Sequence, residues 1–204
     1  MKSTLFILLL CITLLADIGK ITFLKGGVTL TNKATSRSAK VGLMLQEGDT
    51  IQTQKASVVK IIFKDKTIVS IGSKTHFSID EYLFDEASNQ NHVNFSAQKG
   101  IFRMVTGKIG KLAPKKFKLK TKTATMGIRG TIFSVILEEE QEHFVCEKGS
   151  IYVEAQGKSE TIKAGFSSTV TPGSPPQKAT KTPSDILQKI EDATTSWKGK
   201  SCEL

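Results

Sequence analysis

The feature that most constrains the fold is a series of strand-length segments separated by turn residues. Such turn signals recur about every 8–12 residues, a spacing typical of all-β domains. In one clear hairpin, Val59, Ile61 and Phe63 alternate along a strand, the chain turns at Asp65-Lys66, and a second apolar strand returns. The same kind of turn signal stands at Gly26-Gly27 and Gly48-Asp49. The sequence therefore predicts an all-β fold of antiparallel strands.

The N-terminus has the layout of a secretory signal peptide. Lys2 precedes an apolar run over residues 4–16, and Asp17 ends it. This run is short for a membrane span, which needs about 20 apolar residues. We expect residues 1–16 to be a signal peptide and the mature protein to be periplasmic. The alternative is an uncleaved N-terminal anchor that leaves the domain facing the periplasm.

Positive charge is concentrated in the middle of the chain, whose formal net charge is +10. Between Lys99 and Leu137 there are ten basic residues and no acidic one. Such a tract suits anionic lipid, lipopolysaccharide phosphate, polysaccharide or nucleic acid. Because export is expected, nucleic acid is the least favoured of these partners.

Strict alternation over residues 116–123 ("KFKLKTKT") predicts a strand with Phe117 and Leu119 on one face and lysines on the other. One interpretation is an anion-binding stripe. The other, which we favour, is an edge strand that lysines keep soluble and protect from pairing. The candidate anion-binding residues are Lys108, Lys111, Lys116, Lys118, Lys120 and Lys122.

The C-terminal region reads as a linker followed by a helix. Residues 172–183 are rich in Pro, Ser, Thr and Lys. Thr182 is placed to cap a helix, with Pro183 in the first turn and Asp185 at the third helical position.

The expected helix is amphipathic, because apolar residues recur at helical spacing. Its stripe consists of Ile186, Ile190, Ala193 and Trp197. We expect the stripe to dock on the sheet, since a short isolated helix is marginal in water. The alternative is that Ile186, Ile190 and Trp197 contact a partner.

Two cysteines remain if the signal peptide is removed. Cys146 and Cys202 are compatible with one disulfide in an oxidising compartment. The alternative is a small core thiol and a cysteine in a loose tail.

No familiar catalytic or metal-binding motif is present. His76, His92 and His143 lie in separate segments without metal-ligand spacing, and no nucleophile-elbow motif occurs. The acidic run over residues 138–142 is most simply a solvated turn. We expect no enzyme activity, no metal and no cofactor.

The segment "TATMGIRGTIFSV" places Gly127, Arg129 and Gly130 inside an expected strand. Glycine there permits close approach of another backbone, and arginine offers five donors in a fixed fork. We interpret Arg129 as a partly buried structural clamp that fixes a bend in the strand. The alternative is an exposed cation that binds a ligand.

This segment resembles the signature of FecR-domain proteins, and other segments extend the likeness in the same order: "LQEGDTIQTQKAS", "IIFKDKTIVSIG", "FSIDEYLFD", "GIFRMVTGKIGK" and "EKGSIYV". The matching motif residues, taken as structural, are Gly48, Asp49, Gly127, Arg129, Gly130, Thr131 and Phe133. One departure is Asp65-Lys66, where the family usually turns through Asp-Gly. Because a type I′ turn needs positive φ at both positions, we expect a different turn there.

The resemblance implies a periplasmic sandwich or solenoid-like β domain that senses or binds and does not catalyse. We divide the chain into a signal peptide (1–16), a FecR-like domain (17–171), a Pro-rich linker (172–183) and a C-terminal helix and tail (184–204). The leading hypothesis is a stand-alone protein-interaction or signalling adaptor whose partner is an envelope protein. The alternative is a binder of anionic envelope polymers or lipopolysaccharide phosphate through residues 108–122.

Overall fold

The computed structural model describes residues 16–87 and 90–195. The expected signal peptide therefore lies almost wholly outside the described residues, as do Trp197 and Cys202. Within the described residues the chain is almost entirely β-structure, which confirms the predicted fold class.

The described residues form fifteen strands in one continuous, bent sheet. The strands are β1 (Gly19–Lys25), β2 (Val28–Asn32), β3 (Thr35–Ser38), β4 (Met44–Leu45), β5 (Thr50–Thr53), β6 (Val58–Phe63), β7 (Ile68–Ile71), β8 (His76–Leu83), β9 (His92–Val105), β10 (Phe117–Lys120), β11 (Thr125–Leu137), β12 (Glu142–Ala155), β13 (Lys158–Lys163), β14 (Phe166–Val170) and β15 (Thr180–Lys181). Helices α1 (Ile109–Leu112) and α2 (Ser184–Thr194) and the 3-10 turn η1 (Pro114–Lys116) complete the described part.

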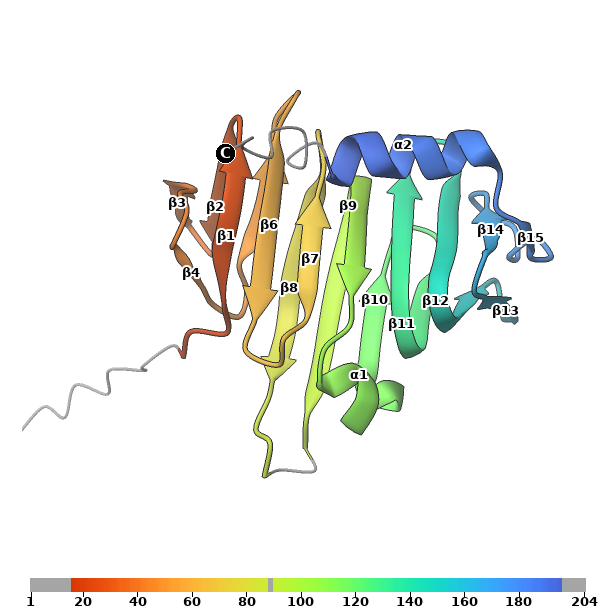
Figure 1. Ribbon diagram of the computed structural model, residues 1–204, viewed down its shortest axis with the longest axis horizontal. Helices are drawn as coiled ribbons and strands as arrows, with labels where there is room; N and C mark the ends of the chain where they lie inside the picture. The colour runs from red at the N-terminus through yellow and green to blue at the C-terminus, as the bar shows by residue number, and fades with distance from the viewer. Residues whose placement is uncertain (1–15, 88–89, 196–204) are drawn as a thin grey trace, which may run out of the picture.

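The sheet folds over into two layers (Figure 1). Layer A has the order β4-β1-β6-β7-β9-β11-β12-β14-β15. Layer B has the order β3-β2-β5-β8-β9-β10-β11-β12-β13. Strands β9, β11 and β12 appear in both layers because they are long enough to cross from one to the other. The architecture is thus a sandwich whose two layers share three strands.

Glycines mark the places where these strands cross. Gly100 in β9, Gly130 in β11 and Gly149 in β12 all have positive φ, and the register of β11 against β12 shifts after Arg129. A Cβ on Gly149 would lie 2.2 Å from the carbonyl oxygen of Gly130. Glycine is therefore required at Gly149 both for its backbone conformation and for the close approach of β11.

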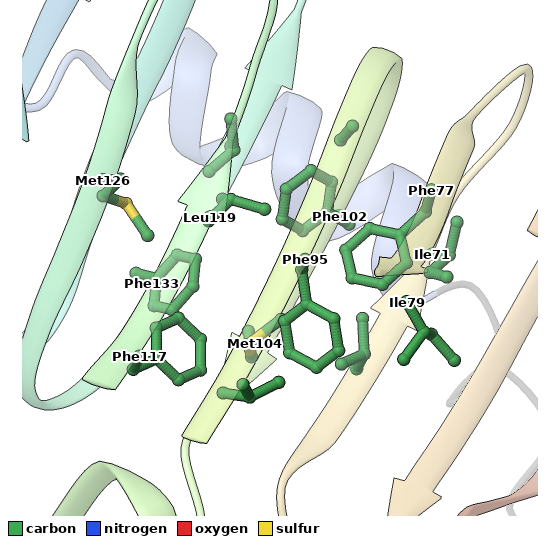
Figure 2. Packing of buried hydrophobic residues seen from close by; sticks show 14 of the residues in the cluster. Ile71, Phe77, Ile79, Phe95, Phe102, Met104, Phe117, Leu119, Met126 and Phe133 are labelled. Carbon is green, nitrogen blue, oxygen red and sulfur yellow. The ribbon is translucent and has the colours of Figure 1, made fainter. Parts of the chain in front are cut away.

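The core between the layers is built around a row of aromatic rings. Figure 2 shows Phe77, Phe95, Phe117 and Phe133 within it, with successive ring centroids 5.2, 5.8 and 6.3 Å apart. These rings come from β8, β9, β10 and β11 and are fully or almost fully buried. Edge-to-face and tilted contacts at these distances stabilise aromatic pairs beyond their burial alone.

The turn between β6 and β7 shows how the chain replaces the usual glycine. Lys66 has a φ of 71°, while Asp65 has no positive φ. The Lys66 N–H donates to the Phe63 carbonyl over 3.0 Å, and the Phe63 N–H donates to the Thr67 carbonyl over 2.9 Å. This is a type I turn followed by a residue in the left-handed region. The expectation that the loop avoids a type I′ turn is confirmed.

Helix α2 lies across the outer face of layer A (Figure 1). Ile190 is buried there against Ile101, Ile136 and Val145, and Ile186 packs beside it. The predicted docking of the helix is confirmed. Consequently Ile186 and Ile190 do not form an open stripe for a partner.

The start of α2 differs from the prediction. Pro183, not Thr182, is the N-cap residue, and no side chain caps the helix. The Thr182 hydroxyl is buried and has no hydrogen-bond partner in the described part of the chain. The predicted cap is therefore wrong, because the chain before Pro183 is extended in β15 and turns into the helix one residue later.

The segment predicted as a linker is attached to the sheet. The Gln177 N–H donates to the Thr169 carbonyl over 2.9 Å, and the Ala179 N–H donates to the Glu160 carboxylate over 2.9 Å. Residues 180–181 then pair with β14. These contacts fix the path of the chain into α2.

Candidate functional site

No helix or strand of residues 16–87 and 90–195 covers the outer face of layer B at β10, and this face carries the predicted lysine stripe. Phe117 and Leu119 are buried and Lys118 and Lys120 are exposed, as the alternation predicts. However, β10 is not an edge strand: it pairs in parallel with β9 and antiparallel with β11. The favoured edge-strand interpretation is therefore wrong, and the lysines project from the interior of a sheet.

The other candidate lysines lie in three different settings. Lys116 and Lys122 are exposed at the two ends of β10, and so continue the stripe. Lys111 is exposed on α1, outside the strand. Lys108 pairs with Glu86, so its charge is already balanced. The structure brings together four of the six predicted lysines.

Arg129 lies on the same outer face. In β11 it pairs with Ser150 of β12, while the adjacent Ile128 points into the core. Its side chain is exposed and makes no ion pair with any described residue. The expectation of a partly buried clamp is therefore wrong, and the alternative of an exposed cation matches the geometry.

Gly127 makes room for an aromatic ring. Its register partner in β12 is Tyr152, and a Cβ on Gly127 would lie 2.0 Å from the Cζ and Oη atoms of that ring. The tyrosine ring therefore lies across the glycine, with 40% of the residue exposed. Tyr152 was not predicted, because its place over Gly127 depends on the pairing register of two strands.

Two hollows flank the Tyr152 ring. One has a volume of about 560 Å³ and is lined by Lys115, Arg129, Ser150 and Thr161, among others. The second has a volume of about 480 Å³ and includes Lys118, Lys122 and Glu154 in its wall. Tyr152 lines both. We call the surface formed by these residues the open face.

A third depression lies beside α2 on layer A, and we call it the α2 groove. Its volume is about 370 Å³, and its lining residues are Lys60, Ile68, Ser70, Arg103, Val105, Glu147, Leu187, Ile190, Glu191, Thr194 and Thr195. Its floor contains a bidentate ion pair, in which Arg103 Nε and Nη2 lie 3.0 and 2.7 Å from Glu147 Oε2. The Ser134 hydroxyl donates to the same carboxylate over 2.9 Å.

Two buried carboxylates fix the turns that carry the family-like motifs. Asp49 accepts hydrogen bonds from Asn32 Nδ2 (2.9 Å), from the Gln46 N–H (2.9 Å) and from Arg37 Nη2 (3.2 Å). These contacts join the β4–β5 turn to the β2–β3 hairpin. Asp49 and Arg37 together thus hold two segments in place here, which is the structural role that the sequence predicts for Arg129.

The buried carboxylate of Asp65 holds the β6–β7 turn in the same way. Its carboxylate accepts from the Thr67 hydroxyl (2.7 Å), the Tyr82 hydroxyl (3.0 Å) and the Ile109 N–H (3.2 Å). Burial, together with the Asp65 charge, raises the pKa of Tyr82 far above its usual value, so this phenol stays a donor. The turn is thereby tied to β8 and α1.

A family model identifies the family to which this chain belongs. The family model described as FecR protein matches residues 49–152, just over half of the 204-residue chain. The chain belongs to the FecR family. The matched region runs from Asp49 to Tyr152 and so includes Lys115, Lys118, Arg129 and Tyr152 of the open face, while Glu154 and Thr161 lie beyond it.

Solved structures support the FecR fold assignment. Two crystal structures, at 1.65 and 2.50 Å resolution, of a "putative anti-sigma factor" from Parabacteroides distasonis ATCC 8503 match with a TM-score of 0.52. The identity is 14%, and the match covers 68% of this chain and 62% of theirs. The similarity therefore concerns the fold, and this chain spans about three fifths of those proteins. No curated protein matches the sequence.

In this FecR-family chain, the remaining motif residues make contacts that hold the fold together. Phe133 is in the core, and the Thr131 carbonyl accepts from the Thr106 N–H and hydroxyl at 3.1 and 2.9 Å. Cys146 is a free, fully buried thiol, and burial raises its pKa. This matches the alternative of a core thiol; Cys202 lies outside the described residues.

His76, His92 and His143 lie on β8, β9 and β12, respectively. Burial lowers the pKa of both His76 and His143. Within residues 16–87 and 90–195, His, Cys, Asp and Glu side chains form no group of three that could hold a metal ion. Among the same residues, neither helix has the length and apolar character of a membrane span.

Proposed function

We propose that this chain is a non-catalytic binding module of the cell envelope that acts as a protein-interaction or signalling adaptor. Membership of the FecR family supports this role, and so does the fold shared with proteins described as anti-sigma factors. We further propose that the chain is exported, on the basis of Lys2 and the apolar run over residues 4–16.

The observation that carries the adaptor proposal is the α2 groove. Leu187 is 46% exposed at the groove, beside apolar Ile68 and Val105. Charges of both signs surround this apolar strip, which is the composition of a surface that anchors one apolar side chain of a partner and orients it through polar contacts. A peptide or helix of an envelope protein fits this description.

Site-specific crosslinking in the producing cell tests the adaptor proposal. A photo-crosslinking residue at Leu187 should capture one envelope protein. The same residue at Leu112, which is 61% exposed on α1, is the matched control and should not capture it. Glu191→Lys, at the groove, should abolish capture from position 187. Capture of the same proteins from both positions, or none from position 187, would contradict the adaptor role.

Export has its own test. N-terminal sequencing of protein from the periplasmic fraction should begin at or near Asp17. An intact Met1 on a cytoplasmic product would contradict export, and an intact Met1 in the membrane fraction would favour the anchored alternative.

A second candidate function is binding of an anionic envelope polymer. The specific observation that favours it is the interior position of β10, which places Lys118 and Lys120 on the same outer face of layer B as Arg129. Binding through several exposed cations should weaken steeply as salt rises, because the interaction is screened over about 10 Å at 0.1 M ionic strength. Capture at the α2 groove should depend on salt much less.

A further inference from the structure

We propose that Tyr152 and the two hollows beside it form a binding site for an acidic polysaccharide chain, an inference that rests on the second candidate function above. The site consists of a central aromatic ring with cations on either side of it. Lys115 and Arg129 line the first hollow, and Lys118 and Lys122 line the second together with one carboxylate, that of Glu154.

The ring is positioned to stack. It lies over Gly127, whose missing side chain leaves the sheet surface flat beneath it, and 40% of the residue is exposed. The face of an aromatic ring is electron-rich and attracts the weakly positive C–H groups of an apolar surface such as that of a sugar ring. Tyr152 is also the only large apolar side chain among the described, exposed ones to lie on this part of layer B.

The charges suit a ligand with repeated acidic groups. Among the described residues that line the first hollow there is no carboxylate, so Lys115 and Arg129 face it without a competing acid. Arginine binds a carboxylate through two parallel hydrogen bonds. Ser150 and Thr161, also in this hollow, offer hydroxyls that can donate to or accept from sugar hydroxyls.

The arrangement favours a polymer of sugars over other anions. These cations are exposed and distributed around a ring, so a single small anion would gain only one or two screened contacts. A single-stranded nucleic acid is bound by several successive stacking platforms, whereas this face offers one. One ring with cations on both sides matches a chain in which a sugar ring stacks and its neighbours carry the acidic groups.

The test is calorimetric titration of the full mature chain with polygalacturonate, whose every sugar ring carries a carboxylate. The unsubstituted protein should bind it and should not bind neutral dextran. Tyr152→Ala should weaken binding at least tenfold, while Tyr152→Phe, which keeps the ring, should stay within twofold. Arg129→Gln should weaken binding about fivefold, and Lys40→Gln, the same charge change on an exposed residue away from the open face, by less than twofold.

Each contrary outcome has a distinct meaning. If the unsubstituted protein binds no polyanion, the second candidate function itself fails. If it binds but folded Tyr152→Ala and Arg129→Gln bind equally well, polymer binding survives and this site is wrong. Tighter binding of single-stranded DNA, or full competition by inorganic phosphate at low millimolar concentration, would overturn the assignment to an acidic polysaccharide.

Discussion

The outer faces of the two layers share strands β9, β11 and β12 but differ in the side chains that these strands turn outward. On layer A, β9, β11 and β12 turn Ile101, Ile136 and Val145 outward, and α2 covers them. On layer B, β11 and β12 turn Arg129 and Tyr152 outward, and no described element covers these side chains. One face is thus packed and the other is open.

The change from one pattern to the other occurs at the glycine bends. In β11 the outward residues before Gly130 include Arg129, and those after it include Ile136. In β12 they include Val145 before Gly149 and Ser150 after it. A strand that crosses between layers can therefore present apolar side chains on the outer face of one layer and polar side chains on the outer face of the other. The comparison teaches that the bends, and not the choice of strands, separate the outer surface that α2 covers from the one that stays exposed.

The largest effect is expected at the bends. Gly149→Ala should cost more than about 3 kcal/mol, because it adds a left-handed penalty of about 1–2 kcal/mol to a clash with the Gly130 carbonyl. Gly157→Ala is the matched control: its φ is also positive, but its Cβ would meet nothing within 4 Å. Its cost should be the left-handed penalty alone, about 1–2 kcal/mol. Equal losses in urea unfolding would show that close approach of the strands does not matter.

The next effect concerns the outer face of layer A that α2 covers, which we call the covered face. Ile190→Ala should lower the free energy of unfolding by about 2–4 kcal/mol, because it leaves a cavity against Ile101 and Ile136. Leu187→Ala, on the same helix but half exposed, should change it by less than about 0.5 kcal/mol. A small loss for both would mean that α2 is not part of the folded unit.

A smaller effect separates the arginines of the two faces. Arg103→Lys should cost about 1 kcal/mol, because lysine cannot form the bidentate contact to Glu147. Arg129→Lys should stay within about 0.5 kcal/mol, because that side chain is exposed without a described partner. Thermal melts of the two variants side by side measure the difference. If Arg129→Lys is the more damaging change, Arg129 is a structural clamp after all.

The smallest effect is a pH dependence at the covered face. Burial, helped by nearby Lys189, lowers the pKa of His143 below 6.5 in the folded chain, although Glu138 and Asp185 act against it. The unfolded chain then binds more protons, so stability is full above pH 6.5 and declines as pH falls through 6.5 toward the folded value. The melting temperature should be lower at pH 5.5 than at 7.5, and His143→Gln should reduce that difference. An unchanged difference in this variant would assign the effect to other groups, His76 first.

Local pattern predicted much of the fold, and pairing between distant segments explains what it missed. Alternation around Phe117 and Leu119 and the helical stripe around Ile190 report which side of one element is apolar, and both were predicted. That β10 pairs with β9 depends on segments more than twenty residues apart, which no local pattern encodes. The exposure of Arg129 and the place of Tyr152 over Gly127 depend in the same way on the register of β11 with β12.

The measurement that tests the central claim most directly is a ¹H–¹⁵N NMR titration of residues 17–204 with polygalacturonate. If the open face binds and the covered face does not, amide shifts should concentrate in residues 115–120, 127–130 and 150–161, and α2 should stay unchanged. Shifts that gather instead around Leu187 and Arg103, in the α2 groove, would contradict the division of roles between the two faces.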